Sequence, residues 1–473
     1  MKRLGLGLLV AAAGCTHVAQ DVRPPSAPAS FQAKPAQQAQ SAANLPERAW
    51  LQTFSAPGLE AVVEEALRVN PDLQRIAAQR DRARASAKAA FGPRLPSIDF
   101  GLGTGRTSVP DGQGGRAAFN VANGDLTASW EVDIWGRVRD NFRAADSSAD
   151  AAQADYYATR LSIAGLAGRA WIDLIEAAGQ ARLTQEDAEA RARTQGQTER
   201  RYDRGVAESL DVRTARAAAA SAQATASAAR EASFIAARRL EALLGRYPAG
   251  EMQPGLDIPQ LGALPPAGTP TLLLARRPDV AAAEARLVAA GFQLNGARKA
   301  LLPRFTLRLV GSTDGDGLRD ITSLEDAVAQ VALGMVAPIF EGGSLRAQVQ
   351  AAKADTRAAA YDYVSTAIAA WEEVENAIGQ DATLAAQESA LRLAAEEASA
   401  AEELTKRDYT RGVATIFDLV QAQAQRINAQ RSLLSVRAAR ATNRIRYHIA
   451  LGGGAEAGPF GATPAEIQEE SKA

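Results

Sequence analysis

The chain has 473 residues, of which 47% are hydrophobic and only 5% aromatic, and its formal net charge at pH 7 is -1. A balanced charge, without a basic stripe among interleaved aromatic residues, argues against nucleic-acid binding. The single cysteine excludes an internal disulfide. The two histidines, His17 and His448, form no cluster at metal-binding spacing, and no nucleophile has an evident base. We therefore expect neither an enzyme nor a bound metal or cofactor.

The first fourteen residues predict a secretory signal peptide, residues 1–14. Lys2 and Arg3 precede a short apolar run, which cannot span a bilayer, and Gly14 precedes Cys15. This pattern resembles the cleavage box of bacterial lipoproteins, in which Cys15 would become the lipidated first residue. The alternative is an ordinary signal peptide with an incidental cysteine. The residue after Cys15 is not aspartate, which favours the outer membrane over the inner membrane.

An extended arm is expected after the signal peptide, over residues 15–58. This segment is rich in Pro, Ala and Gln and shows no hydrophobic periodicity. Such a composition favours a segment that lies on another part of the protein. Regular order is expected to begin near Trp50.

A repeated phrase indicates that the chain contains two copies of one unit. YDRGVAESLD begins at Tyr202, and YTRGVATIFD begins at Tyr409, which is 207 residues further along. The same offset joins several other landmarks: Pro71 and Pro278, Pro96 and Pro303, Tyr156 and Tyr363, Gly245 and Gly452. A fixed period of this length indicates a duplicated half. We predict a first repeat over 59–245, an equatorial linker over 246–268, a second repeat over 269–452 and a flexible tail over 453–473.

Each repeat shows the same order of predicted elements, beginning with a helix and a pair of strands. Residues 59–91 have helical spacing, interrupted at Asn70. Apolar and polar residues then alternate, which predicts strands with one apolar and one polar face. The apolar positions are Ile98, Phe100, Leu102, Leu126, Ala128, Trp130, Val132 and Ile134, then Phe305, Leu307, Leu309, Val331, Leu333, Met335, Ala337 and Ile339. The stretch GLGTG at 101–105 lacks the third glycine and the following helix of a dinucleotide-binding turn.

The apolar face of these strands can either pack on helices or meet lipid. A tilted membrane strand needs about 9–11 residues, which the second strand of each half satisfies. Trp135 and Phe340 close these strands, where an aromatic girdle would lie. Four strands cannot close into a barrel, and an open edge in hydrocarbon leaves backbone amides without partners. A sheet in the membrane would therefore require several chains to build one barrel.

A long helical hairpin is expected to follow the strands in each half. Residues 136–205 contain no proline, which allows a helical rod of roughly 100 Å. We expect the chain to turn at the repeated RGVA, where Gly205 and Gly412 supply the backbone angles of a helix end. Asp211 and Asp418 fall in the first turns of the returning helices, where a carboxylate meets the positive end of the helix dipole.

The returning helix of the second half carries a seven-residue pattern. Val420, Ile427 and Leu434 recur at this spacing, which predicts a coiled-coil seam. Gln423 and Gln430 are expected on another stripe of the same helix.

Taken in order, these features resemble the outer-membrane factors of tripartite efflux systems, the TolC/OprM family, and more narrowly its NodT-type lipoproteins. The features are Cys15, the Pro-rich arm, WLQTFSAPGLEAVVEEALRVNPDLQ, LPS and LPR before the strands, and YxRGVAxxxD twice. The resemblance covers nearly the whole chain after the signal peptide. It implies a mixed α and β fold and a homotrimer, in which four strands per chain build one outer-membrane β-barrel and long helices build a periplasmic coiled-coil barrel.

The resemblance also implies a function, partners and sites. A channel anchored by lipid in the cell outer membrane would passively conduct drugs or other small molecules from a periplasmic adaptor (membrane fusion protein) and an inner-membrane RND pump. The adaptor would dock at the two turns, on Arg204, Gly205, Val206, Ala207, Arg411, Gly412, Val413 and Ala414. The periplasmic aperture would involve Tyr202, Asp211, Tyr409 and Asp418. Ala414 stands where the family usually has arginine, so the lock would be weaker or would use Arg411 instead.

Two other functions stay open at this stage. A duct for type I protein secretion shares the fold, and a periplasmic adaptor is also lipid-anchored with a helical hairpin. An adaptor would need a single hairpin with lipoyl-like β-domains, whereas this chain predicts two hairpins and two strand pairs. The sequence identifies neither the exported substrate nor the partner pump.

Overall fold

A computed structural model of the chain describes residues 22, 24–34, 49–54, 56–110, 112, 114–253, 255, 257–315 and 327–453. The predicted signal peptide, Cys15 and all but the first residue of the predicted tail lie outside the described residues. The described chain is mixed α and β, mostly helical with one four-stranded sheet, as predicted. None of its described helices combines the length and the apolar character that crossing a membrane requires.

The elements form two matching series. After the short α1 (Ala49–Gln52), the first series is α2 (Pro57–Val69), α3 (Pro71–Phe91), η1 (Gly92–Arg94), β1 (Ser97–Pro110), β2 (Arg116–Val132), α4 (Arg137–Asp203) and α5 (Ser209–Leu243). The second series is α6 (Pro270–Arg276), α7 (Pro278–Lys299), β3 (Arg304–Gly315), β4 (Val328–Val336), α8 (Ser344–Arg411) and α9 (Ile416–Ala450). Four pairs of elements begin 207 residues apart: α3 and α7, β1 and β3, α4 and α8, α5 and α9. The offset of the sequence repeat is therefore also the offset of the elements.

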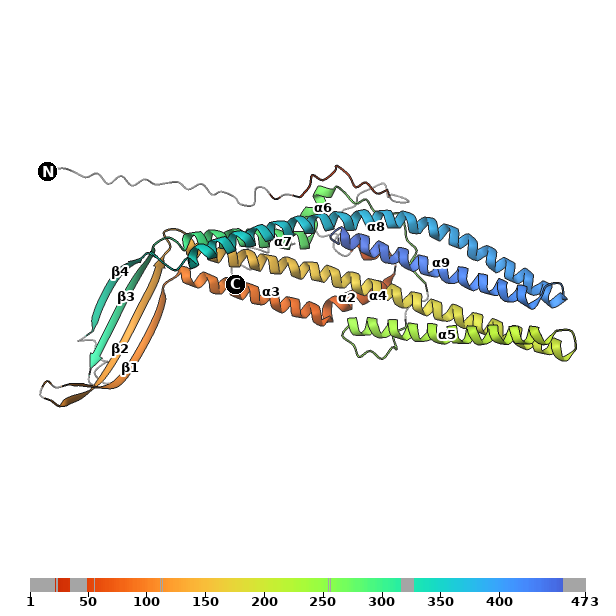
Figure 1. Ribbon diagram of the computed structural model, residues 1–473, viewed down its shortest axis with the longest axis horizontal. Coiled ribbons are helices and arrows are strands. Elements are labelled where there is room, and N and C mark those ends of the chain that lie inside the picture. The colour runs from red at the N-terminus through yellow and green to blue at the C-terminus, as the bar shows by residue number, and fades with distance from the viewer. Residues whose placement is uncertain are drawn as a thin grey trace. The chain divides into compact units, whose positions relative to one another are not determined.

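The described chain divides into two compact units. One contains Arg82–Ala151 and Ala283–Ser365, and it holds the sheet with the adjoining lengths of four helices. The other contains Ser26–Asp81, Ala152–Ala282 and residues 366–453, and we call it the helical unit. Within the helical unit α5 runs back beside α4, and α9 runs back beside α8, so each long helix forms a hairpin with its return (Figure 1).

The sheet has the strand order β1-β2-β3-β4, with all neighbours antiparallel (Figure 1). Its register aligns the predicted apolar positions, because Ala128 lies opposite both Ile98 and Leu309, and Leu309 lies opposite Val331. Most side chains on this face are exposed in the single chain, up to 73% for Phe100, and the others are half-buried. Successive residues of a strand point to opposite faces, so the other face carries polar residues: Asp99, Asp125, Thr127, Ser129, Thr306 and Arg308.

Strand β2 begins and ends earlier than predicted. It starts at Arg116 and has 17 residues, so it extends well beyond the alternating stretch seen in the sequence. It ends at Val132, so the prediction that Ile134 and Trp135 belong to the strand was wrong. The physical reason is Asp133, whose carboxylate accepts the N–H groups of Val138 and Arg139, in the first turn of α4, at 3.1 and 2.8 Å, and so starts the helix.

Strand β4 also ends earlier than predicted. Its last residue is Val336, so the predicted strand positions Ala337 and Ile339 and the closing residue Phe340 lie beyond it. Pro338 accounts for this end, because proline has no N–H to donate to the hydrogen-bond ladder.

Apolar residues at helix spacing on α2 build the main core of the helical unit. Leu59 and Val63 are buried in one cluster with Trp171 of α4 and Ile445 of α9. Gly168 of α4 allows this close packing, since a Cβ atom there would stand 3.1 Å from Ile445 and 3.4 Å from Leu59. The core therefore joins helices of the first half to the last helix of the second half.

Candidate functional site

The two hairpins end in turns with the same backbone geometry. Gly205 and Gly412 have φ angles of 75° and 79°, the left-handed values that glycine adopts without strain, as predicted. The N–H of Val206 donates to a carbonyl of the last turn of α4 at 2.9 Å, and the N–H of Val413 donates to the equivalent carbonyl of α8 at 2.9 Å. These bonds satisfy acceptors that a helix end would otherwise leave unpaired. The repeated phrase thus encodes the turn itself.

The residues predicted to dock an adaptor lie on these two turns. Val206 and Val413 are the most prominent apolar side chains there, 61% and 77% exposed. Arg204 and Arg411 beside them are exposed, whereas the alanines that close each motif are half-buried. Each turn therefore presents an apolar side chain beside an arginine.

Asp211 and Asp418 cap the returning helices. The Asp211 carboxylate accepts the N–H of Glu208 at 3.0 Å. The Asp418 carboxylate accepts both the hydroxyl of Thr415 at 2.6 Å and its N–H at 2.8 Å. These two bonds, the side-chain bond first, lower the pKa of Asp418 below its usual value. Both aspartates thus have the helix-terminus role that the sequence allowed.

The two predicted aperture tyrosines have different surroundings. Tyr202 is 47% exposed, whereas Tyr409 is only 5% exposed. The hydroxyl of Tyr409 lies 2.8 Å from that of Thr198 on α4. Arg201 donates to the Tyr409 carbonyl oxygen at 3.1 Å, and its guanidinium carbon lies 5.0 Å from the ring centre. Tyr409 therefore fastens the second hairpin to the first.

Thr198 and Arg201 were not predicted from the sequence. The cation at Tyr409 is Arg201, not Arg411, which the sequence suggested as a substitute for the missing family arginine. The internal repeat gives no signal for it, because the residue 207 positions after Arg201 is Asp408. Thr198 and Arg201 are three positions apart and so share one face of α4 near its end. Only this spacing could have indicated them.

A polar seam between α4 and α9 continues beyond the turns. Gln423 was expected away from the packed stripe of α9, and this prediction was wrong. Gln423 is 2% exposed, and its amide donates to the hydroxyl of Thr194 at 3.2 Å. The buried residues of α9 here are Ile416, Leu419, Ala422, Gln423 and Ile427. This helix contacts both α4 and α8, so its buried surface does not follow the single seven-residue seam of a two-helix coiled coil.

A buried ionic cluster lies further along the same seam. Asp187 on α4 bonds Arg191 at 2.7 Å and Arg426 of α9 at 3.1 Å. Arg426 also bonds Glu402 of α8 and donates to Gln430 at 2.7 Å. A single arginine therefore joins three helices, and removing it would leave the largely buried carboxylate of Glu402 without a counter-charge, whereas Asp187 would keep Arg191.

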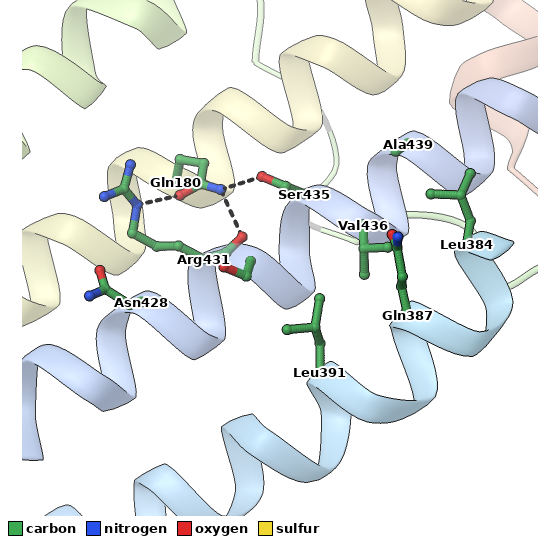
Figure 2. A pocket seen from close by; sticks show the side chains of 10 residues that line it. Gln180, Leu384, Gln387, Leu391, Asn428, Arg431, Ser435, Val436 and Ala439 are labelled. Carbon is green, nitrogen blue, oxygen red and sulfur yellow. Dashed lines mark hydrogen bonds between the residues drawn. The ribbon is translucent and has the colours of Figure 1, made fainter. Parts of the chain in front are cut away.

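A cavity of about 560 Å³ opens between α8 and α9, with Gln180 of α4 at its border (Figure 2). Gln180 accepts from Arg431 at 2.9 Å and donates to Ser435 at 3.1 Å, and both bonds are marked in Figure 2. The remaining lining residues mix apolar side chains with amides and a hydroxyl: Leu384, Gln387, Leu391, Asn428, Ser432, Val436 and Ala439. The side chains of Gln180, Arg431 and Ser435 at its border bond one another. We therefore interpret the cavity as a structural gap between packed helices of the helical unit and not as a ligand-binding site.

The linker between the repeats is held against α9. Arg444 is 1% exposed and donates to the carbonyl oxygens of Gly262 and Ala263 at 3.0 and 3.2 Å. The hydroxyl of Tyr447 donates to the carbonyl oxygen of Pro265 at 2.5 Å. Burial raises the pKa of Tyr447, so this hydroxyl remains a donor.

His448 lies next to Arg444 and Tyr447 in the chain and is buried against Trp50. The two rings stack with their centres 5.8 Å apart. Burial, and secondarily the charge of Arg444, lowers the pKa of His448 to about 3. The imidazole is therefore neutral at physiological pH.

The buried carboxylate of Glu241 in the helical unit is a structural acceptor. Glu241 accepts the N–H groups of Gly250, Glu251 and Met252 at 2.7, 2.8 and 2.9 Å. Burial alone would raise the pKa of Glu241, but these three bonds lower it below its usual value. Within the described ranges, no group of three or more His, Cys, Asp or Glu side chains could hold a metal ion.

The chain combines two helical hairpins with matching turns, a four-stranded sheet and a linker bonded to α9. A sequence profile of the family described as Outer membrane efflux protein matches the chain twice, over residues 62–246 and 269–453. The chain therefore belongs to the outer membrane efflux protein family. It is an efflux channel of the outer membrane, and the two matched segments have the same 207-residue offset as the repeat.

Individual relatives cover nearly the whole chain. The pyoverdine export outer membrane protein OpmQ of Pseudomonas putida is 29% identical over 91% of this chain and 92% of that protein. Nodulation protein T of Rhizobium leguminosarum bv. viciae is 27% identical over 90% and 88%. The solved structure of the outer-membrane channel OprN has a TM-score of 0.83 and 27% identity, covering 91% of this chain and 98% of that one. The CmeC channel of Campylobacter jejuni shares the fold, with a TM-score of 0.87 at 22% identity, covering 95% and 97%.

Proposed function

We propose that three copies of this chain form one exit duct through the outer membrane. The observation that carries this proposal is the sheet, whose apolar face is exposed across all four strands. Its outer strands β1 and β4 each have only one neighbour in the described chain. Backbone amides on such an edge need partners in hydrocarbon, and the edge strand of another copy supplies them. Three sheets of four strands make a closed barrel of twelve, with the polar face inward.

The helices of the three copies would continue the duct as a coiled-coil tunnel in the periplasm. Helices α4 and α8 have 67 and 68 residues, which corresponds to about 100 Å each. With α5 and α9, each copy contributes two hairpins, one from each repeat, 59–245 and 269–452. The linker 246–268 would form the equatorial region, and residues 453–473 would be a flexible tail.

The six turns of the trimer would form the periplasmic mouth and dock a helical-hairpin adaptor. The exposed valines and arginines of the two turns suit a mixed apolar and polar contact. Tyr202 and Asp211 of the first hairpin and Tyr409 and Asp418 of the second would surround the aperture, with Arg201 beside Tyr409 as part of the lock. Transport through the duct would be passive, driven by an inner-membrane RND pump through the adaptor.

The N-terminal segment would anchor the duct by lipid. Residues 1–14 would be removed as a signal peptide, Cys15 would carry the acyl chains, and residues 15–58 would form the arm. Radioactive palmitate is expected to label the wild-type protein and not the Cys15→Ala variant. Equal labelling of the two proteins would contradict the anchor.

The transported compounds are proposed to be small molecules. Two relatives are named for pyoverdine export and for toluene efflux, and both names denote small-molecule transport by those proteins. Expression of this chain with its cognate pump and adaptor is expected to lower the susceptibility of an efflux-deficient host to small toxic compounds. Secretion of a protein substrate without any effect on susceptibility would favour the type I alternative.

The trimer and its topology can be tested together. Native mass measurement in detergent is expected to give three copies per particle. Gly315→Cys, at the end of β3, should react with an impermeant maleimide on intact cells. Arg204→Cys, at the first turn, is the matched control and should react only after lysis. Labelling of both variants only after lysis would contradict the proposed orientation.

A further inference from the structure

The register of the strand pairs repeats with the internal duplication. Ser97 of β1 lies opposite Ser129 of β2. The residues 207 positions further along, Arg304 of β3 and Val336 of β4, also lie opposite each other. Every rung of the β3–β4 pair, meaning two residues that lie opposite each other, has such an equivalent in the β1–β2 pair. Because a slip by one residue would turn each side chain to the other face of the sheet, both halves keep one register.

The β2–β3 pair joins the two halves of the chain. It sets Asp125 opposite Ser312, and Leu126 opposite Gly311 on the next rung. In this pair the second strand of the first half meets the first strand of the second half. The strands with the equivalent roles are β4, the second strand of the second half, and β1, the first strand of the first half. They are the two edges of the sheet, so a contact between β4 and another copy's β1 repeats a contact already present within the chain.

We infer that β4 of one copy pairs with β1 of the next copy in the register of the β2–β3 pair. Ala332 then lies opposite Gly105 of the next copy, because these residues are 207 positions from Asp125 and Ser312. The inference rests on the proposed trimer and adds the register in which its copies join. The strands of a barrel share one tilt, so the pair that closes it needs the stagger of the pairs inside each copy. All 9 residues of β4 then have a partner on β1.

The side chains of the two edges are compatible with this register. On the apolar face, Met335 lies opposite Leu102 of the next copy. On the other face the facing residues are short, as with Ala332 and Gly105, so the strands approach without a bulky side chain between them. A Cβ atom at Gly105 would have no described atom of its own copy within 4 Å. Strand β4 carries no charged residue, so no rung between the copies sets like charges opposite each other.

Paired cysteines in the full-length protein test the register. Ala332→Cys with Gly105→Cys is expected to form disulfides between copies under copper–phenanthroline, giving a covalent trimer on non-reducing electrophoresis. Opposite residues of an antiparallel pair have Cα atoms about 4.5–5.5 Å apart, which a disulfide can bridge. Asp125→Cys with Ser312→Cys is the matched control, because it is the equivalent rung within one chain and should close without joining copies.

Two further pairs test a slipped register. Ala332→Cys with Gly103→Cys, and Ala332→Cys with Thr107→Cys, represent slips of two residues, which keep the same face of the sheet. Their cysteines are diagonal neighbours about 7–8 Å apart, beyond the reach of a disulfide. The yield of covalent trimer should be at least tenfold lower than for the matched rung. A higher yield from either slipped pair would overturn the register. The single variants Ala332→Cys and Gly105→Cys reveal any link through Cys15.

The neighbouring rung covers the case in which the control pair does not close. Adjacent rungs of an antiparallel pair alternate between hydrogen-bonded and non-hydrogen-bonded geometry. Leu333→Cys with Thr104→Cys is then compared with its own control, Leu126→Cys with Gly311→Cys. The expected result is again a covalent trimer from the first pair and a link within one chain from the second.

The outcomes separate the register from the trimer on which it rests. A native mass of one copy per particle overturns the trimer and the register together. If the native mass is that of three copies and the control pair closes, but the equivalent pair between copies does not link them, the register is overturned and the trimer stands.

Discussion

The two hairpin turns share a backbone but not an environment. Tyr202 is largely exposed, whereas Tyr409, at the equivalent position, is buried and bonded to Thr198. The difference lies in the partner helix, since the residue equivalent to Thr198 is Thr405, a half-buried residue whose hydroxyl donates to the carbonyl oxygen of Ala401 on its own helix. A repeated phrase thus specifies the turn, and the neighbouring helix decides what the same tyrosine contacts.

Equivalent positions near the linker diverge in a similar way. Asn70 donates to the carbonyl oxygen of Leu243 at 2.9 Å, and Arg277 donates to the equivalent carbonyl, that of Ala450, at 3.0 Å. The accepting group is the same, but the donor changes from a neutral amide to a guanidinium that also bonds Glu373. The two halves therefore keep one contact by different chemistry, which can be tested with matched substitutions.

The largest effect is expected at this pair. Arg277→Ala removes a buried donor and leaves the carboxylates of Asp279 and Glu373 without their partner, which should cost about 3 kcal/mol of unfolding free energy. Asn70→Ala removes neutral bonds only and should cost about 2 kcal/mol. Thermal unfolding in detergent should show the lower midpoint for Arg277→Ala. A lower midpoint for Asn70→Ala would contradict the difference between the halves.

A second pair of equivalent residues, His448 and Glu241, predicts how a lower pH changes the free energy of unfolding in the two halves. His448 has its pKa lowered to about 3 from 6.5, so the unfolded chain binds its proton first and stability falls as pH drops below 6.5. At about 1.4 kcal/mol per pH unit, the loss between pH 6.5 and 5 is about 2 kcal/mol. His448→Phe should remove this part of the pH dependence of the unfolding midpoint.

Glu241, the equivalent residue of the first half, supplies the control. Its pKa is lowered from 4.5, so its contribution is complete above pH 4.5 and disappears as pH falls through the folded value. Glu241→Gln should therefore leave the slope between pH 6.5 and 5 unchanged. If that slope changed in Glu241→Gln and not in His448→Phe, the pH dependence between pH 6.5 and 5 would belong to Glu241 and not to His448.

Much of the fold follows from two periods that the sequence displays. Alternation with period two predicted the strands and their apolar face, and the 207-residue offset predicted a second set of the same elements. Strand ends were less predictable, because they depend on single groups: the cap by Asp133 after β2 and the missing N–H of Pro338 after β4. Local periodicity does not reveal such competition at a boundary.

The sequence predicted where the candidate site lies but not which side chains contact one another there. The glycine turns and their aspartates followed from the repeated phrase. The partners of Tyr409 come from the other hairpin, 211 residues away in the case of Thr198, and no periodicity within one helix identifies them. Gln423 was misplaced for the same reason, since α9 packs against α4, α5 and α8 and not along a single seam.

A smaller effect is expected at the caps of the returning helices. Thr415 caps α9 with its hydroxyl, whereas the cap residue of α5 is Glu208. Thr415→Ala should cost about 1 kcal/mol, as for other N-cap threonines. Hydrogen exchange should show faster opening of the first turn of α9. Glu208→Ala is the matched control, and an equal or larger opening of α5 in that variant would contradict the stronger cap of the second half.

The smallest effect is expected from the tyrosines themselves. The hydroxyl of Thr198 donates to the carbonyl oxygen of Thr194 at 2.9 Å, so Tyr409 must be the donor in its bond to Thr198. Tyr409→Phe then removes one donor and leaves Thr198 with its own bond, which costs less than about 1 kcal/mol. A closed aperture held partly by this bond should leak slightly more in planar bilayers, with trimer yield unchanged. Tyr202→Phe alters an exposed side chain and should conduct like the wild type. Equal leak from both variants would show that the buried bond does not distinguish the two hairpins, and that the lock lies in residues that they share.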